Sequence, residues 1–219
     1  MAIARVALER GLVMKIAILG AGSVGQALAS GWQKAGHDIR FGVRDASRDR
    51  GGIPAAPVAD AAAASEVVVI ATPWPDTRAA IQSAGDLTGR ILIDCTNALG
   101  AGPEGLHLVV GFATSAGEQV AQWARGASVF KTLNQVGANV MADARAFGPP
   151  APVMFVAGDD AARKPAVLSL VADLGFEAVD AGPLRNARLL EPFAMLWIDQ
   201  ALTRGVGRDF AFAITRRRV

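Results

Sequence analysis

Residues 17–45 read AILGAGSVGQALASGWQKAGHDIRFGVRD, and they hold three glycines in the spacing G-x-G-x-x-G: Gly20, Gly22 and Gly25. An apolar segment at residues 15–19 precedes the glycines, and residues 24–35 follow them with helical periodicity. A second apolar segment covers residues 38–43. A lone glycine motif is a weak signal, and the strand–helix–strand context is what makes this one specific. The stretch therefore predicts the first βαβ unit of a Rossmann-type fold.

Each glycine of the motif has its own physical role. Gly20 permits a tight turn after the strand, Gly22 lets the backbone approach a pyrophosphate, and Gly25 lets the helix pack on the strand. The helix N-terminus then points unpaired N–H groups and the positive end of its dipole at the phosphates. The motif predicts a dinucleotide site, and the alternative is a glycine-rich turn that binds nothing.

The end of the second strand carries Val43 and Arg44, where a carboxylate normally binds the adenosine ribose. That carboxylate hydrogen-bonds the ribose 2′-hydroxyl and repels a 2′-phosphate. A guanidinium instead grips phosphate through charge-assisted, bidentate hydrogen bonds. Arg48 and Arg50 follow closely, although Asp45 comes directly after Arg44. We therefore expect NADP(H) rather than NAD(H), and a solvated loop without specificity is the alternative.

The composition predicts a globular chain with a sizeable core. Of its 219 residues, 52% are hydrophobic and 19% are charged, and the net charge is +2. These values argue against disorder and against nucleic-acid binding driven by bulk charge. The single Cys95 and the two histidines, His37 and His107, exclude a disulfide framework and cysteine-rich or histidine-rich metal sites. No apolar run is long enough to span a bilayer, so we expect a cytoplasmic protein without a membrane segment.

Strand-like and helix-like segments alternate from residue 45 to about residue 180. The expected strands after the glycine unit cover residues 67–71, 90–94, 128–131, 153–157 and 176–180. One expected helix ends near residue 83, and three others cover residues 115–123, 138–144 and 160–174. Residues 95–105 are expected to form a turn. This alternation predicts an α/β fold, with a doubly wound parallel sheet covered by helices on both faces.

We expect three segments: an N-terminal extension (1–13), a Rossmann domain (14–182) and a small C-terminal helical part (183–219). The last contains an expected helix at residues 186–203 that is apolar nearly all round, which makes it buried on most faces and a candidate homodimer interface. Arg188 and Glu191 lie one turn apart and are expected to pair. Pro192 is expected to bend this helix or to mark its effective start.

The carboxyl ends of the strands, where doubly wound sheets bind ligands, carry few titratable groups. Their turns supply hydroxyls, amides and one aromatic ring: Thr72, Trp74, Thr96, Asn97, Thr132, Asn134 and Gln135. Lys131 is a candidate acid or, equally, a salt-bridge partner, and Cys95 is expected in the core. An alcohol dehydrogenase needs a proton acceptor, whereas hydride exchange between two flat rings needs mainly stacking and exclusion of water. We therefore expect a second substrate with its own redox ring, and we assign no catalytic residue and no metal.

Five segments resemble the NADP oxidoreductases dependent on the deazaflavin coenzyme F420, and the related reductase domains of the six-transmembrane (STEAP) metalloreductases: ILGAGSVG, VRD, ATPW, KTLNQVGANV and VDAGPLRNARLLEP. The resemblance covers residues 14–212, and the stretch at residues 180–191 is long enough to be specific. It implies a Rossmann domain with a small C-terminal helical part, usually dimeric. Members move hydride between NADP(H) and a flavin or deazaflavin.

The resemblance also implies site residues. Ser23 and Val24 would lie over the pyrophosphate, and Arg44, helped by Arg48, would hold the 2′-phosphate. Residues 205–207 would border the second ring. The full implied cofactor set is Gly20, Gly22, Ser23, Val24, Gly25, Arg44, Arg48, Thr72, Pro73, Trp74, Asn97, Asn134 and Val136. Within it, Asn97 and Asn134 are the candidates to orient the rings.

One turn departs from the family pattern. Residues 131–137 carry Asn134 and Gly137 where deazaflavin reductases typically have a histidine and a proline. This turn is more similar to the metalloreductase branch, which uses an ordinary flavin. The acceptor therefore stays open between the deazaflavin coenzyme F420, FMN and FAD. Two other functions also stay open: an NADP-dependent dehydrogenase of a small carbonyl or imine, and a non-catalytic NADP-sensing module.

Overall fold

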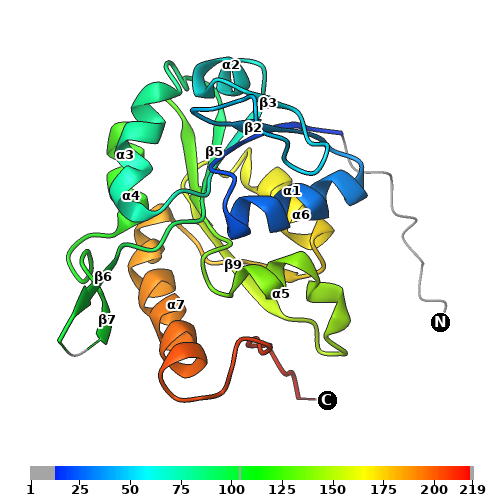
Figure 1. Ribbon diagram of the computed structural model, residues 1–219. Helices are drawn as coiled ribbons and strands as arrows, with labels where there is room; N and C mark the ends of the chain where they lie inside the picture. Colours follow the sequence, from blue (N-terminus) through cyan, green and yellow to red (C-terminus); the bar gives the residue numbers. More distant parts are fainter. Residues whose placement is uncertain (1–12, 104, 218–219) are drawn as a thin grey trace.

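The structure is a computed structural model that describes residues 13–103 and 105–217. The N-terminal extension expected at residues 1–13 therefore lies outside the described residues, apart from Val13. From Met14 onward the chain forms layers of helix, sheet and helix (Figure 1). None of the helices in these two ranges is both long enough and apolar enough to cross a membrane.

The central sheet of the described chain has eight strands in the order β10-β9-β8-β5-β4-β1-β2-β3. Their bounds are β1 Lys15–Leu19, β2 Asp38–Gly42, β3 Ala55–Ala56, β4 Val67–Ile70, β5 Ile91–Asp94, β8 Ser128–Lys131, β9 Val153–Gly158 and β10 Glu177–Asp180. Residues such as Val67–Ile70 are buried on both faces of the sheet, which accounts for their continuous β-branching. The expected α/β fold is confirmed.

The sheet is mostly parallel, as expected, and departs from the parallel arrangement at one edge. β9 runs antiparallel to β8, and β10 runs parallel to β9. Two short helices, α5 Ala138–Ala142 and η1 Ala144–Ala146, lie between β8 and β9. Residues 132–152 would be enough for a parallel crossover, so the length of the connection does not force the reversal. The Gln135 amide continues the pairing beyond β8, because it accepts the N–H of Phe155 and donates to its carbonyl, both at 3.0 Å.

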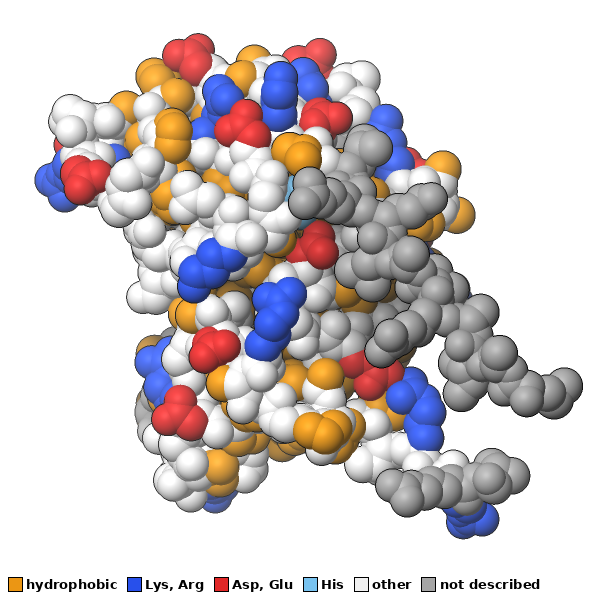
Figure 2. Space-filling view, turned by 90° about the vertical axis from the view of Figure 1, so that its right-hand side faces the viewer, with side chains coloured by type: hydrophobic (Ala, Val, Ile, Leu, Met, Phe, Trp, Pro, Cys, Tyr) orange, Lys and Arg blue, Asp and Glu red, His pale blue; other side chains and the backbone are white. Residues whose placement is uncertain are grey.

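Helices cover both faces of the sheet. On one face α1 Ser23–Ala35, α5 and α6 Lys164–Asp173 enclose a core around Trp32 and Phe130. On the other face lie α2 Val58–Ala63, α3 Trp74–Ser83 and α4 Ala116–Trp123, over a core around Leu92. Positive and negative side chains are interspersed on the side of the molecule shown in Figure 2.

The final helix, α7 Ala187–Leu202, follows a short turn, η2 Leu184–Asn186, and contacts α4. Pro192 lies inside α7, so it does not mark the start of the helix. Beside α7, the expected turn at residues 95–105 contains the first strand of a hairpin, formed by β6 Leu99–Gly102 and β7 Gly105–Leu108. The hairpin projects from the body (Figure 1). Its first strand reads as a turn because glycine, which weakens strands, occupies half of it.

Candidate functional site

The glycine turn between β1 and α1 has the geometry that its three glycines predict. Gly20 adopts φ +109°, a left-handed conformation, and a Cβ there would lie 2.6 Å from the Ala71 carbonyl oxygen. A Cβ at Gly25 would collide with the carbonyl oxygen of Gly20. At Gly22, in contrast, a Cβ would meet no heavy atom within 4 Å. The turn is therefore packed tightly on its inner side and open on its outer side.

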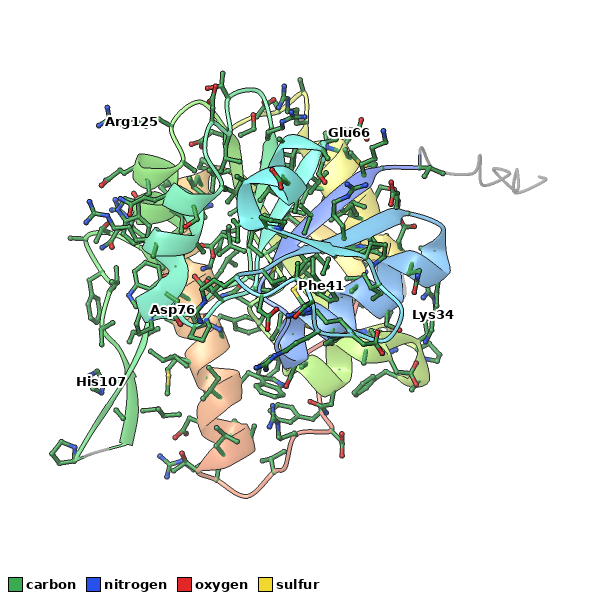
Figure 3. The ribbon with its side chains drawn as sticks, turned by 45° about the horizontal axis from the view of Figure 1, so that its top comes forward. Lys34, Phe41, Glu66, Asp76, His107 and Arg125 are labelled. Atoms are coloured by element: carbon green, nitrogen blue, oxygen red, sulfur yellow. The ribbon has the colours of Figure 1, made fainter. Side chains whose placement is uncertain are left out.

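The open side of this turn faces a cavity of about 510 Å³. Gly20–Gly22, the loop after β2 and the turn after β4 line it. The first intrahelical bond of α1 runs from the Gln26 N–H to the Gly22 carbonyl, at 2.9 Å, so the preceding N–H groups of the helix have no partner within it. Asp76, which also lines the cavity, lies at the start of α3 (Figure 3). The arrangement offers an anion a helix N-terminus and an unobstructed backbone.

A loop with three arginines closes the far side of the cavity. Arg44, Arg48 and Arg50 all line it. Arg50 braces the loop, because its two terminal nitrogens donate to the carbonyls of Arg48 at 2.6 Å and of Asp45 at 2.7 Å. Arg44 makes no hydrogen bond or ion pair with another described residue. Its guanidinium therefore has full capacity for a phosphate.

Asp45, the carboxylate next to Arg44, is engaged within its own loop. It accepts hydrogen bonds from the Ser47 hydroxyl at 2.6 Å and the Ser47 N–H at 3.0 Å, and from Arg48 Nε at 3.2 Å. The Ser47 hydrogen bonds, aided by Arg48, lower the pKa of Asp45 below its usual value. Oδ1 thus accepts two hydrogen bonds and Oδ2 accepts one, so most of the acceptor capacity of Asp45 is used within its own loop.

The turn after β4 contributes two of its three expected residues to the cavity. Thr72 and Pro73 line it, and the Thr72 hydroxyl lies 3.0 Å from that of Thr77. The Trp74 ring instead packs against Trp123 of α4, with their centroids 5.3 Å apart. It lies with the core on that face of the sheet. Because the indole is committed to this packing, it does not line the described cavity.

The two asparagines expected to orient the rings are brought together at the ends of β5 and β8. Asn97 Nδ2 donates to the Asn134 carbonyl at 2.8 Å, and Asn134 Nδ2 donates to Asn97 Oδ1 at 3.1 Å. Asn134 is buried, and its Oδ1 accepts from Gln135 Nε2 at 3.2 Å. Leu133, which lies between the end of β8 and Asn134, has φ +56°, a conformation that costs about 1–2 kcal/mol in a residue other than glycine. The surrounding contacts therefore hold this turn in a defined shape.

The remaining expected residues lie in different environments. Ser23 is exposed at the start of α1, and Val24 is half-buried beside it. Val136 is buried within the core. Residues 205–207 lie in an exposed segment beyond α7. Their contacts with the cofactor stay a prediction.

Lys131 is a buried ion-pair partner. It is fully buried, and its Nζ lies 2.9 Å from Asp94 Oδ2 and 3.2 Å from Glu191 Oε1. Burial alone would lower the pKa of the Lys131 ammonium, but the two carboxylates more than offset this effect and raise it. The expected pair of Arg188 with Glu191 is wrong: Arg188 binds Glu118 of α4 instead, through contacts of 2.6 and 2.8 Å. Sequence spacing identifies neighbours on one helix but not a partner on another element.

The structure adds two roles that sequence patterns do not indicate. Arg50 acts as a brace of the loop, which only its two backbone contacts reveal. Glu191 is a buried carboxylate in a helix that reads as apolar. The sequence offered one signal: Glu191 is a charged residue among apolar neighbours on this helix. Charged residues are seldom buried without a partner.

Comparisons with known proteins agree with this geometry. Residues 15–98 match the family model described as NADP oxidoreductase, coenzyme F420-dependent. A candidate F420-dependent NADP reductase from Arthrobacter sp. FB24 is similar over 93% of this chain and 100% of its own, with 34% identity and a TM-score of 0.84. A hypothetical protein from Sinorhizobium meliloti is similar over 84% of this chain and 92% of its own, with 26% identity and a TM-score of 0.72.

A more distant match shares the fold. The reductive aminase from Aspergillus terreus, solved with NADPH and ethyl levulinate, has 21% identity and a TM-score of 0.65 over 89% of this chain and 63% of its own. The family model over residues 15–98 and the full-length match to the Arthrobacter protein decide the assignment. The chain belongs to the family of coenzyme F420-dependent NADP oxidoreductases, and it is thus an NADP-dependent oxidoreductase.

Proposed function

We propose that the protein transfers a hydride between NADPH and a flat redox ring, a deazaflavin or a flavin. The observation that carries this proposal is the cavity itself, which joins an unobstructed glycine turn to an arginine loop in which Asp45, the carboxylate next to Arg44, is already engaged. Gly20, Gly22 and the N-terminus of α1 would bind the pyrophosphate. Arg44 and Arg48 would bind the 2′-phosphate, on a loop braced by Arg50.

Bound NADPH supplies a hydride, two electrons with one proton, from its nicotinamide ring to the acceptor ring. The chain's part in this reaction is to hold the two rings in contact and to exclude water. The ionisable residues that line the described cavity are arginines and two aspartates, Asp45 and Asp76. Lys131 has no exposed surface, so it has no path for proton exchange with a substrate. This arrangement favours direct hydride transfer without a protein acid or base.

A dehydrogenase acting on a small carbonyl or imine is the second candidate. The reductive aminase of Aspergillus terreus has this fold, but the present chain spans only 63% of its length. A module that only senses NADP is the third candidate, and it would bind the nucleotide without turnover.

One experiment separates these functions. The protein is incubated with NADPH and offered coenzyme F420, FMN, FAD and ferric chelates in parallel, with a ketone–amine mixture as a further arm. Loss of NADPH absorbance with F420 or a flavin is expected, and NADH should support it poorly. Turnover with the ketone–amine mixture alone would replace the proposal by the second candidate. Tight binding of NADPH without any turnover would replace it by the third.

We also propose that the protein works as a homodimer in the cytoplasm. Seven of the eight large apolar side chains exposed in the described chain lie on the β6–β7 hairpin and the residues after it, or on α7 and the residues after it: Leu106, Val109, Phe112, Leu189, Leu196, Leu202 and Val206. β7 and α7 are in contact. Exposed apolar side chains gathered on two adjacent elements are unusual on a soluble monomer, and a second copy would cover them through the same face.

A further inference from the structure

Three charged side chains are buried together beneath the ends of β5 and β8. Lys131 and Asp94 have no exposed surface, and Glu191 is 1% exposed. Lys131 Nζ binds both carboxylates, at 2.9 Å and 3.2 Å. A buried ion pair brings little net stability, because desolvation of the charges offsets their attraction. The cluster therefore calls for an explanation other than stability.

The excess negative charge of this cluster is balanced by a helix. Glu191 accepts the N–H groups of Ala116 at 2.9 Å and Gly117 at 3.0 Å, which open α4. The N-terminus of a helix carries a partial positive charge, and it stabilises a carboxylate there. Gly117 allows this approach, because a Cβ in its place would lie 3.1 Å from the Ala187 Cβ. Glu191 thus joins α7 to α4 and, through Lys131, to the sheet.

The same lysine fixes the turn that carries Asn97. Lys131 Nζ donates to the Thr96 carbonyl at 2.6 Å, and the Thr96 N–H donates to Asp94 Oδ1 at 2.9 Å. Both backbone groups of Thr96 are therefore held by the buried cluster. The neighbouring residue of α7 acts on the other asparagine, since the Leu190 carbonyl lies 3.4 Å from Asn134 Nδ2. Consecutive residues of α7 thus contact the networks that hold both turns.

Asn97 and Asn134 differ in what they can still bind. Asn134 is 3% exposed, and its side chain is shared among Asn97, Gln135 and Leu190. Asn97 is half-buried, and one of its two amide hydrogens has no acceptor among the described residues. An amide carries two N–H donors and a carbonyl acceptor. Asn97 therefore faces outward with spare capacity, and Asn134 supports it from behind.

We propose that Lys131 and Glu191 are positioning residues, which hold the Asn97 amide in place to hydrogen-bond the nicotinamide carboxamide and so couple α7 to the reacting ring. This inference rests on the function proposed above. The carboxamide has one donor and one acceptor group, and a single amide side chain can complement either. A displacement of about 1 Å at such a contact can lower a rate about a hundredfold.

The test compares two glutamates that both join α4 to α7. Glu191→Gln keeps the shape of the side chain and leaves the Lys131–Asp94 pair neutral overall. Glu118→Gln, the matched control, removes the ion pair with Arg188 but leaves the buried cluster intact. Three quantities are measured: the Kd of NADPH, the circular dichroism of the bound nicotinamide, and kcat with the best acceptor. The side-chain amide NMR signals of Asn97 are recorded without nucleotide.

For Glu191→Gln we expect a shifted Asn97 amide signal, altered dichroism of the bound nicotinamide and a kcat about tenfold to a hundredfold lower, with the Kd of NADPH within about threefold. Glu118→Gln should leave all four measurements unchanged. An unchanged Asn97 signal and dichroism in Glu191→Gln overturn the inference, and so does an equal change in both variants. If wild-type protein does not bind NADPH, the proposed function itself fails, which the first titration reveals separately.

A second variant covers the case in which Glu191→Gln does not fold. The triple variant Lys131→Met/Asp94→Asn/Glu191→Gln removes all three charges, so no buried charge is left without a partner. It also removes the hydrogen bond from Lys131 to the Thr96 carbonyl. We expect changes in dichroism and kcat at least as large as in the single variant. A folded triple variant with wild-type kcat and dichroism overturns the inference.

Discussion

We propose that the choice of nucleotide depends on Arg44. It faces the cavity without a protein partner among the described residues, so its loss should weaken only the contact with a 2′-phosphate. Removal of one charge-assisted hydrogen bond costs about 1.5–3 kcal/mol, or about tenfold to a hundredfold in Kd. We expect Arg44→Ala to weaken NADPH binding by that factor and to leave NADH binding nearly unchanged, as measured by fluorescence titration.

The control for this prediction is Arg125→Ala. Arg125 does not line the cavity, and Figure 3 shows it well away from Asp76 at the cavity. The Arg125→Ala protein should bind both nucleotides with wild-type affinity. An equal loss of NADPH and NADH affinity in Arg44→Ala would contradict the assignment of this residue to the 2′-phosphate.

Cys95 gives a prediction about reactivity and pH. Burial, together with the nearby Asp94, raises the pKa of the Cys95 thiol far above its usual range, and the thiolate is the reactive form. We expect native protein at pH 8 to react with thiol reagents only as fast as it opens, whereas urea-unfolded protein reacts at once. Rapid labelling of the folded protein would show that Cys95 is accessible.

The same thiol makes a contribution to stability that falls with pH. An unfolded thiol ionises at about pH 8.5, while the folded thiol stays protonated to a much higher pH. The unfolded state therefore binds fewer protons above that value, and this contribution decreases as the pH rises. Equilibrium unfolding of wild type and Cys95→Ala between pH 7 and pH 10 should show the difference in slope.

At the scale of single residues, sequence patterns reach the groups whose role depends on local backbone or on neighbours in the same loop. The glycines of the first turn and the position of Arg44 are of this kind. The roles of Arg50 and Glu191 were not predictable in the same way. Each depends on contacts that form only once the loop or the helix is folded against its neighbours.

At the scale of elements, the β1–α1 turn offers a matched pair of substitutions. Gly22→Ala should fold normally, with stability within about 0.5 kcal/mol of wild type, because a Cβ there meets nothing within 4 Å. It should nevertheless bind NADPH much more weakly, since the methyl group would occupy the path of the pyrophosphate. Thermal unfolding and nucleotide titration check the two parts.

Gly25→Ala, in contrast, should lower the stability of the protein. Its Cβ would collide with the Gly20 carbonyl, and overpacking of this kind destabilises proteins by about 1–3 kcal/mol. A Gly25→Ala protein as stable as wild type would contradict the packing described for this turn. Normal NADPH binding by Gly22→Ala would contradict the placement of the pyrophosphate.

Strand and helix positions were largely predictable from periodicity, while strand direction was not. A buried strand such as Val153–Gly158 has the same hydrophobic pattern whether it runs parallel or antiparallel to its neighbour. Its direction is accompanied by pairing contacts between residues distant in the sequence, such as those of Gln135 with Phe155. The helical content of the connection is also overestimated when residues 138–144 are taken as one helix. The β6–β7 hairpin was missed because its first strand is half glycine.

At the scale of the whole molecule, the exposed apolar face predicts the oligomeric state. We expect light scattering to show a dimer for the wild type and a monomer for Leu196→Glu, which places a charge in the middle of α7 where the side chain is 49% exposed. Val13→Glu, at an exposed apolar position that precedes β1, is the control and should stay dimeric. A monomeric wild type would remove the dimer from the proposal.

The general architecture and the likeness to nucleotide-binding oxidoreductases were accessible from the chain alone, because alternating strands and helices with one glycine motif admit few arrangements. The acceptor was not accessible. We propose that its recognition depends on how α7 and the ends of β5 and β8 meet, and the residues that bring these elements together are distant in the sequence. Asn97 and Asn134, for instance, lie 37 positions apart.

The packing of Trp74 on Trp123 has an optical consequence. The chain has no tyrosine and four tryptophans, so indoles dominate its ultraviolet emission. Trp32 and Trp197 are buried and donate their N–H groups to the Leu170 and Phe210 carbonyls, which shields them from ligands. The Trp74–Trp123 pair is half-buried and adjoins Pro73 at the cavity wall. Reduced nicotinamide absorbs where indole emits, so this pair should act as a built-in energy donor that reports nucleotide binding without any attached label.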